Sequence, residues 1–166
     1  MGSRPPFAAR QTSSQLASHA LAARWEQELA NWHTAYRIEG KAFVERHHER
    51  TKRAKGAPDF GGTLHGGRSV VFDAKFVLND GKLYWSKVQK HQRESLYNHA
   101  RMGAVAMVIV RFNLQKRDCA FLVDPAMGDS FVMRPTNGVA FGPDGWWPAV
   151  RWALSPHSID HHLEPR

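Results

Sequence analysis

The stretch PDFGGTLHGGRSVVFDAKFVL, residues 58–78, decides the fold. It predicts a β-hairpin, because the glycine pair at 66–67 supplies a turn and the segment after it is rich in β-branched and aromatic residues. Successive side chains of a strand face opposite sides, so Asp73 and Lys75 share one side with Val71. The other side carries the apolar residues Val70, Phe72, Ala74 and Phe76. We expect the apolar side to face the core and Asp73 and Lys75 to point away from it.

The segments around this hairpin complete an α/β pattern. Apolar residues recur at helical spacing over residues 15–37, and a capping-box spacing at 86–89 predicts a second helix that runs to residue 102. Residues 104–112 are nearly all apolar, as in a strand covered on both faces, and 119–123 form a shorter run of the same kind. A strand, a helix and a strand joined by long connections predict a parallel pair. The expected fold class is therefore α/β, with a mixed β-sheet flanked by helices.

The chain length of 166 residues predicts a single domain. We place it at residues 15–155, between a flexible N-terminal segment, 1–14, and a flexible C-terminal tail, 156–166. Residues 131–133 are expected to form a further strand. The stretch GPDGWWPAVRW is expected to be a loop that packs Trp146 and Trp147 on the core.

The amino-acid composition indicates the class of binding partner and the cellular compartment. Lys and Arg outnumber Asp and Glu by 23 to 15, which gives a formal charge of +8 and favours a polyanionic partner such as nucleic acid. Cys119 is the only cysteine, so no intramolecular disulfide forms and a reducing compartment fits best. No apolar run is long enough to cross a bilayer, and no membrane partner is expected. These features predict a cytoplasmic protein.

The most basic stretch, residues 44–55, comes just before the acidic motif. A solvated surface would explain such a run, but its position favours contact with DNA phosphates. The residues expected to make this contact are Arg46, Arg50, Lys52, Arg53 and Lys55.

Asp59, Asp73 and Lys75 fit the chemistry of phosphodiester hydrolysis. Two carboxylates can hold Mg²⁺, or Mn²⁺ as a substitute, which neutralises the phosphate and activates a water molecule. A lysine two residues after the second carboxylate can stabilise the charge that develops. The alternative is a surface ion pair between Asp73 and Lys75, with Asp59 as a turn residue after Pro58.

The order of several motifs resembles the RecU-type Holliday junction resolvases, metal-dependent homodimers of the PD-(D/E)xK nuclease superfamily. The resemblance covers residues 22–112: it includes WEQEL, PDFGG, VVFDAK, KHQRESL and GAVAMVIVRF. It implies a restriction-endonuclease-like core. By this resemblance Asp59, Asp73 and Glu26 are metal ligands and Lys75 is the catalytic lysine. Glu28 remains the alternative to Glu26.

The same resemblance assigns two residues of the second helix. Gln92 matches a catalytic residue and His91 lies toward the DNA, whereas a helix-surface or core role is the alternative for both. The family's long stalk has only residues 38–57 as its counterpart here. Archaeal-type resolvases share the nuclease core without that stalk.

The sequence thus predicts a Mg²⁺-dependent endonuclease that cuts symmetric strands of four-way DNA junctions as a homodimer, in recombination, repair or phage DNA processing. One alternative is another PD-(D/E)xK endonuclease with a flap, duplex or site-specific substrate. The other is a non-catalytic DNA-binding protein on the same fold.

Overall fold

A computed structural model describes residues 13–47 and 57–155 of the chain. Both expected terminal tails, apart from residues 13 and 14, and most of the basic stretch lie outside these residues. The elements in chain order are α1 (Ser13–Ile38), β1 (Ala42–Arg46), β2 (Phe60–Leu64), β3 (Ser69–Val77), β4 (Leu83–Tyr84), the 3₁₀ turn η1 (Trp85–Lys87), α2 (Lys90–Arg101), β5 (Val105–Phe112), β6 (Arg117–Leu122), β7 (Val132–Met133), β8 (Val139–Ala140) and α3 (Trp147–Leu154).

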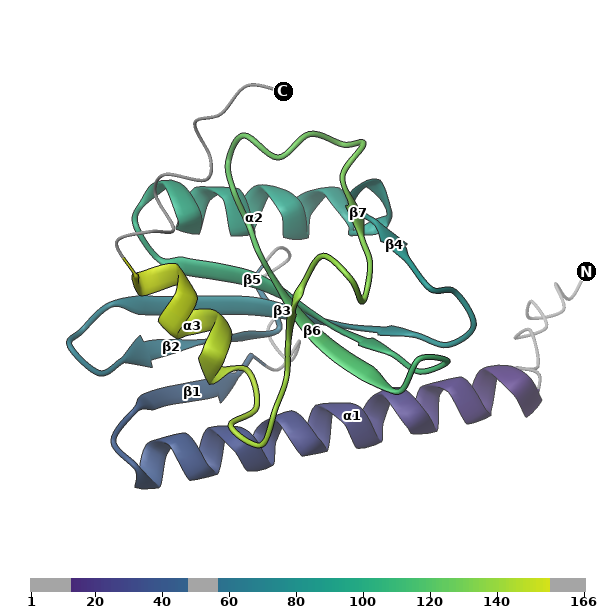
Figure 1. The fold of residues 1–166 in the computed structure, drawn as a ribbon, viewed down its shortest axis with the longest axis horizontal. Helices are drawn as coiled ribbons and strands as arrows, with labels where there is room; N and C mark the ends of the chain where they lie inside the picture. The colour runs from purple at the N-terminus through teal and green to yellow at the C-terminus, as the bar shows by residue number, and fades with distance from the viewer. Residues whose placement is uncertain (1–12, 48–56, 156–166) are drawn as a thin grey trace, which may run out of the picture.

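The main sheet is mixed, as expected. Among the described residues its six strands lie in the order β1-β2-β3-β5-β6-β8, and β4 pairs with β7 in a separate ribbon. β3 and β5 are parallel, with Asp73 opposite Val108, whereas the other neighbours are antiparallel. The helix α2 connects the two parallel strands and lies on one face of the sheet, while α1 and α3 lie on the other (Figure 1). The α/β prediction is confirmed.

The hairpin that decides the fold forms as predicted. β2 and β3 pair antiparallel with Phe60 opposite Phe72, and the turn between them contains Gly66 and Gly67, both at φ +87°. Side chains with a Cβ rarely adopt this left-handed conformation, so the two glycines allow the tight reversal. The reversal sets the register that brings Asp59 back to β3.

Both faces of β3 are buried, which corrects the expectation that one face points away from the core. Val70 and Phe72 belong to the cluster under α1 and α3, while Val71 and Val77 belong to the cluster under α2. The expected division of the side chains is right. The face that carries Asp73 is nevertheless covered, because α2 packs on it, and Asp73 is fully buried.

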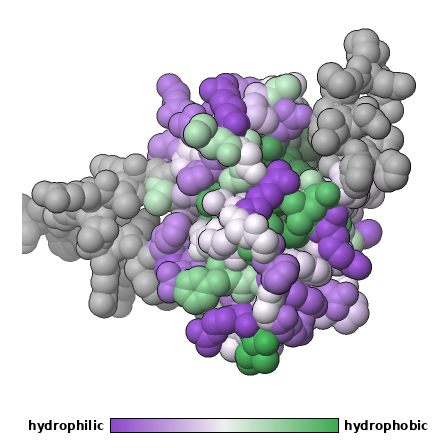
Figure 2. Space-filling view, turned by 90° about the vertical axis from the view of Figure 1, so that its left-hand side faces the viewer, coloured by the Kyte–Doolittle hydropathy of each residue, from purple (hydrophilic) through white to green (hydrophobic). Residues whose placement is uncertain are grey.

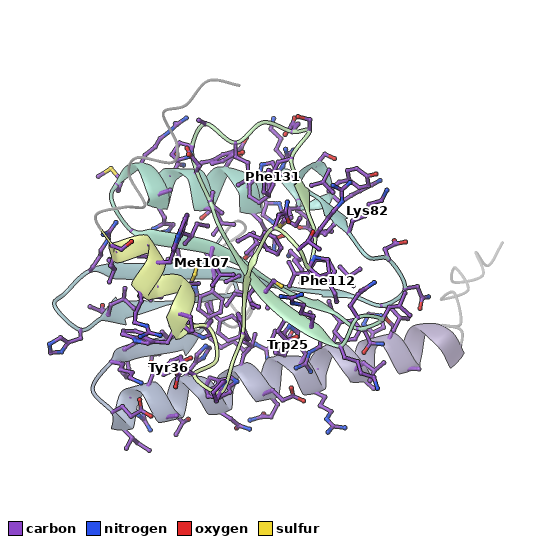
Figure 3. The ribbon with its side chains drawn as sticks, viewed as in Figure 1. Trp25, Tyr36, Lys82, Met107, Phe112 and Phe131 are labelled. Atoms are coloured by element: carbon purple, nitrogen blue, oxygen red, sulfur yellow. The ribbon has the colours of Figure 1, made fainter. Side chains whose placement is uncertain are left out.

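The long helix α1 anchors the first core cluster. Trp25, Leu29 and Tyr36 are at most 2% exposed, and Figure 3 shows Trp25 and Tyr36 pointing from α1 toward the sheet. Tyr36 meets the ring of Trp146 edge-on at 4.8 Å between centroids. These spacings confirm the predicted amphipathic helix.

The C-terminal segment completes the same cluster. Trp146 is fully buried, as expected for a packing role, and Trp147 packs against the cluster from its edge. The predicted loop is wrong in part, however, because residues from Trp147 onward form α3. Pro148 is compatible with this helix because it occupies the first turn, where no amide donor is needed.

The predicted start of α2 is also wrong. Ser86 lies in η1, and α2 begins at Lys90 with no side-chain hydrogen bond capping its N-terminus. Trp85 is fully buried and its indole donates to the Tyr97 hydroxyl at 2.5 Å. Packing of Trp85 against α2 therefore takes the place of the expected capping box.

Exposed apolar side chains are scattered over the face of the molecule that Figure 2 shows. Figure 2 views the end of the molecule where the β2–β3 turn and the last turn of α1 lie, and apolar side chains appear there as separate spots among hydrophilic ones. In the described part of the chain, no helix is long and apolar enough to cross a membrane.

Candidate active site

Two reciprocal hydrogen bonds join Asp59 to β3. The Asp59 amide donates to Asp73 Oδ1 at 3.0 Å, and the Ala74 amide donates to Asp59 Oδ2 at 3.0 Å. The antiparallel register, with Phe60 opposite Phe72, places Asp59 directly across from Asp73. The hairpin therefore brings together the two carboxylates that the sequence predicted to be metal ligands.

Asp73 is an ionisable group in an apolar setting. It is 0% exposed, and its Oδ2 atom has no hydrogen-bond partner. Burial raises the pKa of Asp73 to about 6; the positive charge of Lys75 opposes this rise and the negative charge of Asp59 adds to it. A buried carboxylate oxygen without a donor is costly, so a bound cation would relieve the cost.

Lys75 is held beside Asp73 by a residue of α2. Its Nζ atom lies 2.9 Å from Gln92 Oε1, a hydrogen bond, and 3.8 Å from Asp73 Oδ2, which is too far for one. His91 is exposed on the first turn of α2, close enough for its charge to lower the pKa of Asp73 slightly. The structure thus gathers Asp59, Asp73, Lys75 and Gln92, with His91 at the rim.

Glu26 and Glu28 are held in separate ion pairs. Glu26 on α1 pairs with Arg46 at the end of β1, the residue opposite Phe60 in the sheet. Glu28 binds Arg111 at 2.7 Å, and Arg111 also forms a bidentate pair with Asp118. Glu26 is therefore tied to the strand that leads toward Asp59, and Glu28 to the β5–β6 hairpin.

Of the residues in the basic stretch 44–55 that are predicted to contact DNA, only Arg46 falls in the described part of the chain. Its pairing with Glu26 leaves its side chain about half exposed. Arg50, Lys52, Arg53 and Lys55 lie outside the described residues.

The sequence does not predict the position of His47. This residue lies in the basic stretch at 44–55, but the structure places it against Asp59. The His47 amide donates to the Asp59 carbonyl at 2.8 Å, and its ring Nδ1 lies 2.8 Å from the Pro58 carbonyl oxygen. No periodicity or motif in the sequence indicates this contact, which spans 11 residues.

The donor set at Asp59 and Asp73 fits a hard divalent cation, which prefers carboxylate oxygens. The unpartnered Oδ2 of Asp73 supplies one such oxygen. Among the described residues no group of three or more His, Cys, Asp or Glu side chains is close enough to hold a metal ion. Glu26 therefore stands apart from the carboxylate pair while it is bound to Arg46.

Comparison with known proteins gives a structural neighbour and a sequence family. The structure is similar to that of Hjc, a Holliday junction resolvase from the archaeal hyperthermophile Archaeoglobus fulgidus, with a TM-score of 0.51 and 18% identity over 71% of this chain and 94% of that one. No protein of curated function matches the sequence. The sequence model of the RecU family, described as Recombination protein U, matches residues 26–136. The match spans more than half of the chain and includes every residue of the candidate site, so this chain belongs to the RecU family.

Proposed function

We propose that this protein is a metal-dependent endonuclease that resolves four-way DNA junctions, with Asp59, Asp73 and Lys75 at its active site. The observation that carries the proposal is the buried, unpartnered Oδ2 of Asp73, which lies opposite Asp59 and 3.8 Å from the Lys75 ammonium. Membership of the RecU family and similarity to the fold of Hjc support the junction as the substrate.

Asp59 and Asp73 would hold Mg²⁺, with Mn²⁺ as a substitute. When bound, the ion supplies Lewis acidity and lowers the pKa of a water molecule. Lys75 neutralises negative charge that builds up on the phosphate during hydrolysis. Gln92 keeps the Lys75 ammonium beside the carboxylates, since its amide oxygen accepts a hydrogen bond from Nζ.

Glu26 is the third carboxylate of this proposal. It is paired with Arg46 in the structure, and a DNA phosphate near Arg46 would compete with Glu26 for the guanidinium. Release from Arg46 would free Glu26 to act at the metal. Arg46, the basic residues after it (Arg50, Lys52, Arg53 and Lys55) and His91 would then contact the DNA backbone.

The proposal includes a homodimer, because resolution of a four-way junction requires two cuts on symmetry-related strands and each chain carries one carboxylate pair. It also includes a cytoplasmic location, since the proposed substrate is intracellular DNA. The nuclease domain would span residues 15–155.

Two other functions fit the fold. One is an endonuclease with a flap, duplex or site-specific substrate. The other is a non-catalytic DNA-binding protein, but the charged Asp73 argues against it. A binding surface gains nothing from a buried carboxylate with an unpaired oxygen, which costs stability.

A paired binding and cleavage experiment separates these functions. The Asp73→Asn protein should bind an immobile four-way junction more tightly than linear duplex of the same sequence. The unaltered protein with Mg²⁺ should cut two opposed strands near the crossover. Equal affinity for both DNAs with scattered nicks would favour a different endonuclease, and no cleavage with either metal would favour the binding protein.

A further inference from the structure

His47 binds the chain on both sides of the Asp59 backbone. Its amide donates to the Asp59 carbonyl, and its ring returns to the Pro58 carbonyl, each at 2.8 Å. A carbonyl oxygen only accepts hydrogen bonds, so Nδ1 carries the hydrogen and donates it. Pro58 is buried, and this bond satisfies a carbonyl that would otherwise lose its contact with water.

The ring of His47 occupies space that exists because residue 61 is glycine. A Cβ atom on Gly61 would lie 2.6 Å from Cε1 and 3.0 Å from Nε2 of His47, but 3.7 Å from Nδ1. Gly61 is not among the described glycines with positive φ, so its backbone conformation does not require glycine. What requires glycine at this position is the imidazole packed over it.

The second glycine of the PDFGG motif has a different task. A Cβ on Gly62 would lie 1.9 Å from the backbone oxygen of Phe43, so this glycine allows β1 to approach β2. Gly62 therefore allows the close pairing of β1 with β2, whereas Gly61 leaves space for the His47 ring.

We propose that His47 is a positioning residue that fixes Asp59 for metal binding, an inference that rests on the proposed function. The β3 side of Asp59 is fixed by its hydrogen bonds with Asp73 and Ala74. Only the His47 ring among the described side chains bonds to the Pro58 carbonyl. Without it, the bond from the Asp59 amide to Asp73 is the only hydrogen bond among the described residues that holds the Pro58–Asp59 peptide, so the Asp59 carboxylate is positioned less firmly.

Substitutions of His47 separate this role from a direct contact with DNA. The amide nitrogen of asparagine stands at about the position of the histidine Nδ1, whereas that of glutamine reaches about as far as Nε2. If Nδ1 positions Asp59, His47→Asn preserves function and His47→Gln does not. If Nε2 instead binds a phosphate, glutamine is the better replacement, and DNA affinity is the quantity that falls.

The first measurement is the affinity of the full chain for Mn²⁺ in the absence of DNA, monitored by electron paramagnetic resonance. We expect His47→Ala, His47→Gln and Gly61→Ala each to weaken Mn²⁺ binding roughly 10–100-fold, as is typical when a group that orients a metal ligand is lost. His47→Asn should bind Mn²⁺ about as tightly as the unaltered protein. His65→Ala is the matched control, because His65 is an exposed histidine at the other end of the β1–β2 pair.

The double variant His47→Asn with Gly61→Ala gives the sharpest test. Asparagine has no atom at the Cε1 position, so an alanine Cβ at residue 61 would meet only the nitrogen, at an ordinary distance near the 3.7 Å of Nδ1. The double variant should therefore recover the Mn²⁺ binding that Gly61→Ala alone loses. Thermal unfolding of each variant shows whether a loss reflects general destabilisation, which asparagine at residue 47 would not repair.

The outcomes distinguish this inference from the proposed function. If the unaltered protein cleaves junctions but His47→Ala binds Mn²⁺ normally, only the positioning role is overturned. The same holds if the double variant binds as weakly as Gly61→Ala, or if glutamine rescues better than asparagine. If the unaltered protein binds Mn²⁺ and the variants behave as expected but no DNA is cut, the positioning role stands and the nuclease assignment fails.

Discussion

Lys75 donates its hydrogen bond to Gln92 on α2, at 2.9 Å, and not to the neighbouring carboxylate of Asp73, whose Oδ2 is 3.8 Å away. A lysine bound tightly to Asp73 would neutralise the charge that attracts a metal ion. The tether to Gln92 keeps the ammonium near the carboxylates but leaves one oxygen of Asp73 without a hydrogen bond.

This arrangement predicts the effect of Gln92→Ala. The ammonium of Lys75 should then move toward Asp73 Oδ2, so that a higher Mg²⁺ concentration is needed for half-maximal cleavage.

Lys75→Ala, in contrast, should lower the single-turnover rate by roughly 10²–10³-fold, because it removes charge stabilisation in the transition state. Fluorescence anisotropy should show nearly unchanged DNA affinity for both variants, and a parallel loss of affinity and rate for Lys75→Ala would identify it as a phosphate anchor.

Asp73→Asn should abolish cleavage and yet stabilise the metal-free protein. The fully buried carboxylate loses its charge, while the remaining amide oxygen can still accept the hydrogen bond from the Asp59 amide. We expect the free energy of unfolding in EDTA at pH 8 to rise by roughly 1–2 kcal/mol, less than the full cost of the charge because the new NH₂ group is also buried. Urea denaturation measures this free energy. A destabilised variant would contradict the interpretation that the buried charge of Asp73 destabilises the metal-free protein.

The pH dependence of stability follows from the same residue. Burial raises the pKa of Asp73 from 3.8 to about 6, so its stabilising contribution is complete below pH 4 and is lost as the pH rises through 6. The loss amounts to roughly 3 kcal/mol in the absence of metal. Burial also lowers the pKa of His33 to about 4. This residue therefore makes the unfolding free energy increase, and not decrease, as the pH rises from 4 to 6.5.

The difference between the unaltered protein and Asp73→Asn cancels the contribution of His33. In EDTA, this difference in unfolding free energy should shift in favour of Asp73→Asn between pH 4 and pH 7. Saturating Mg²⁺ should flatten or reverse the shift, because a bound cation favours the charged carboxylate. A difference that does not change with pH would show that Asp73 titrates alike in the folded and unfolded chains.

Glu26→Gln and Glu28→Gln should separate catalysis from stability. Glu26→Gln removes the proposed third carboxylate and should lower the rate of Mg²⁺-dependent cleavage with little change in melting temperature. Glu28→Gln leaves Arg111 with Asp118 and the ring of Trp25, 4.0 Å from the guanidinium carbon, and should lower the unfolding free energy by less than about 1 kcal/mol. The reverse pattern in cleavage assays would assign the catalytic role to Glu28.

The sequence was most informative where one rule acts locally. The alternation in 69–77 predicts which side chains share a face, and the glycines at 66 and 67 predict the turn, so the approach of Asp59 to Asp73 could be foreseen. The uniformly apolar β5 predicted a buried central strand, and its parallel pairing with β3 followed from the helix between them.

Features that depend on packing between distant segments could not be predicted. Whether the Asp73 face of β3 is exposed depends on where α2 rests, and no residue of β3 itself carries that information. The pairing of Glu26 with Arg46 and the contact of His47 with Pro58 each join separate elements. The helix α3 was obscured by the Pro and Gly residues near its start, which also occur in loops.

The packing of Trp146 on α1 has a consequence for where this protein can be shortened. The RecU family match ends at residue 136, yet Trp146, Ala149 and Val150 are buried in the cluster beneath α1. A fragment ending at 136 would uncover Tyr36 and Phe72 and leave a void the size of a tryptophan, whose loss from a core typically costs about 3–5 kcal/mol. The smallest part of the chain that folds on its own therefore extends past residue 136, where the family match ends, because α3 and Trp146 complete the core under α1.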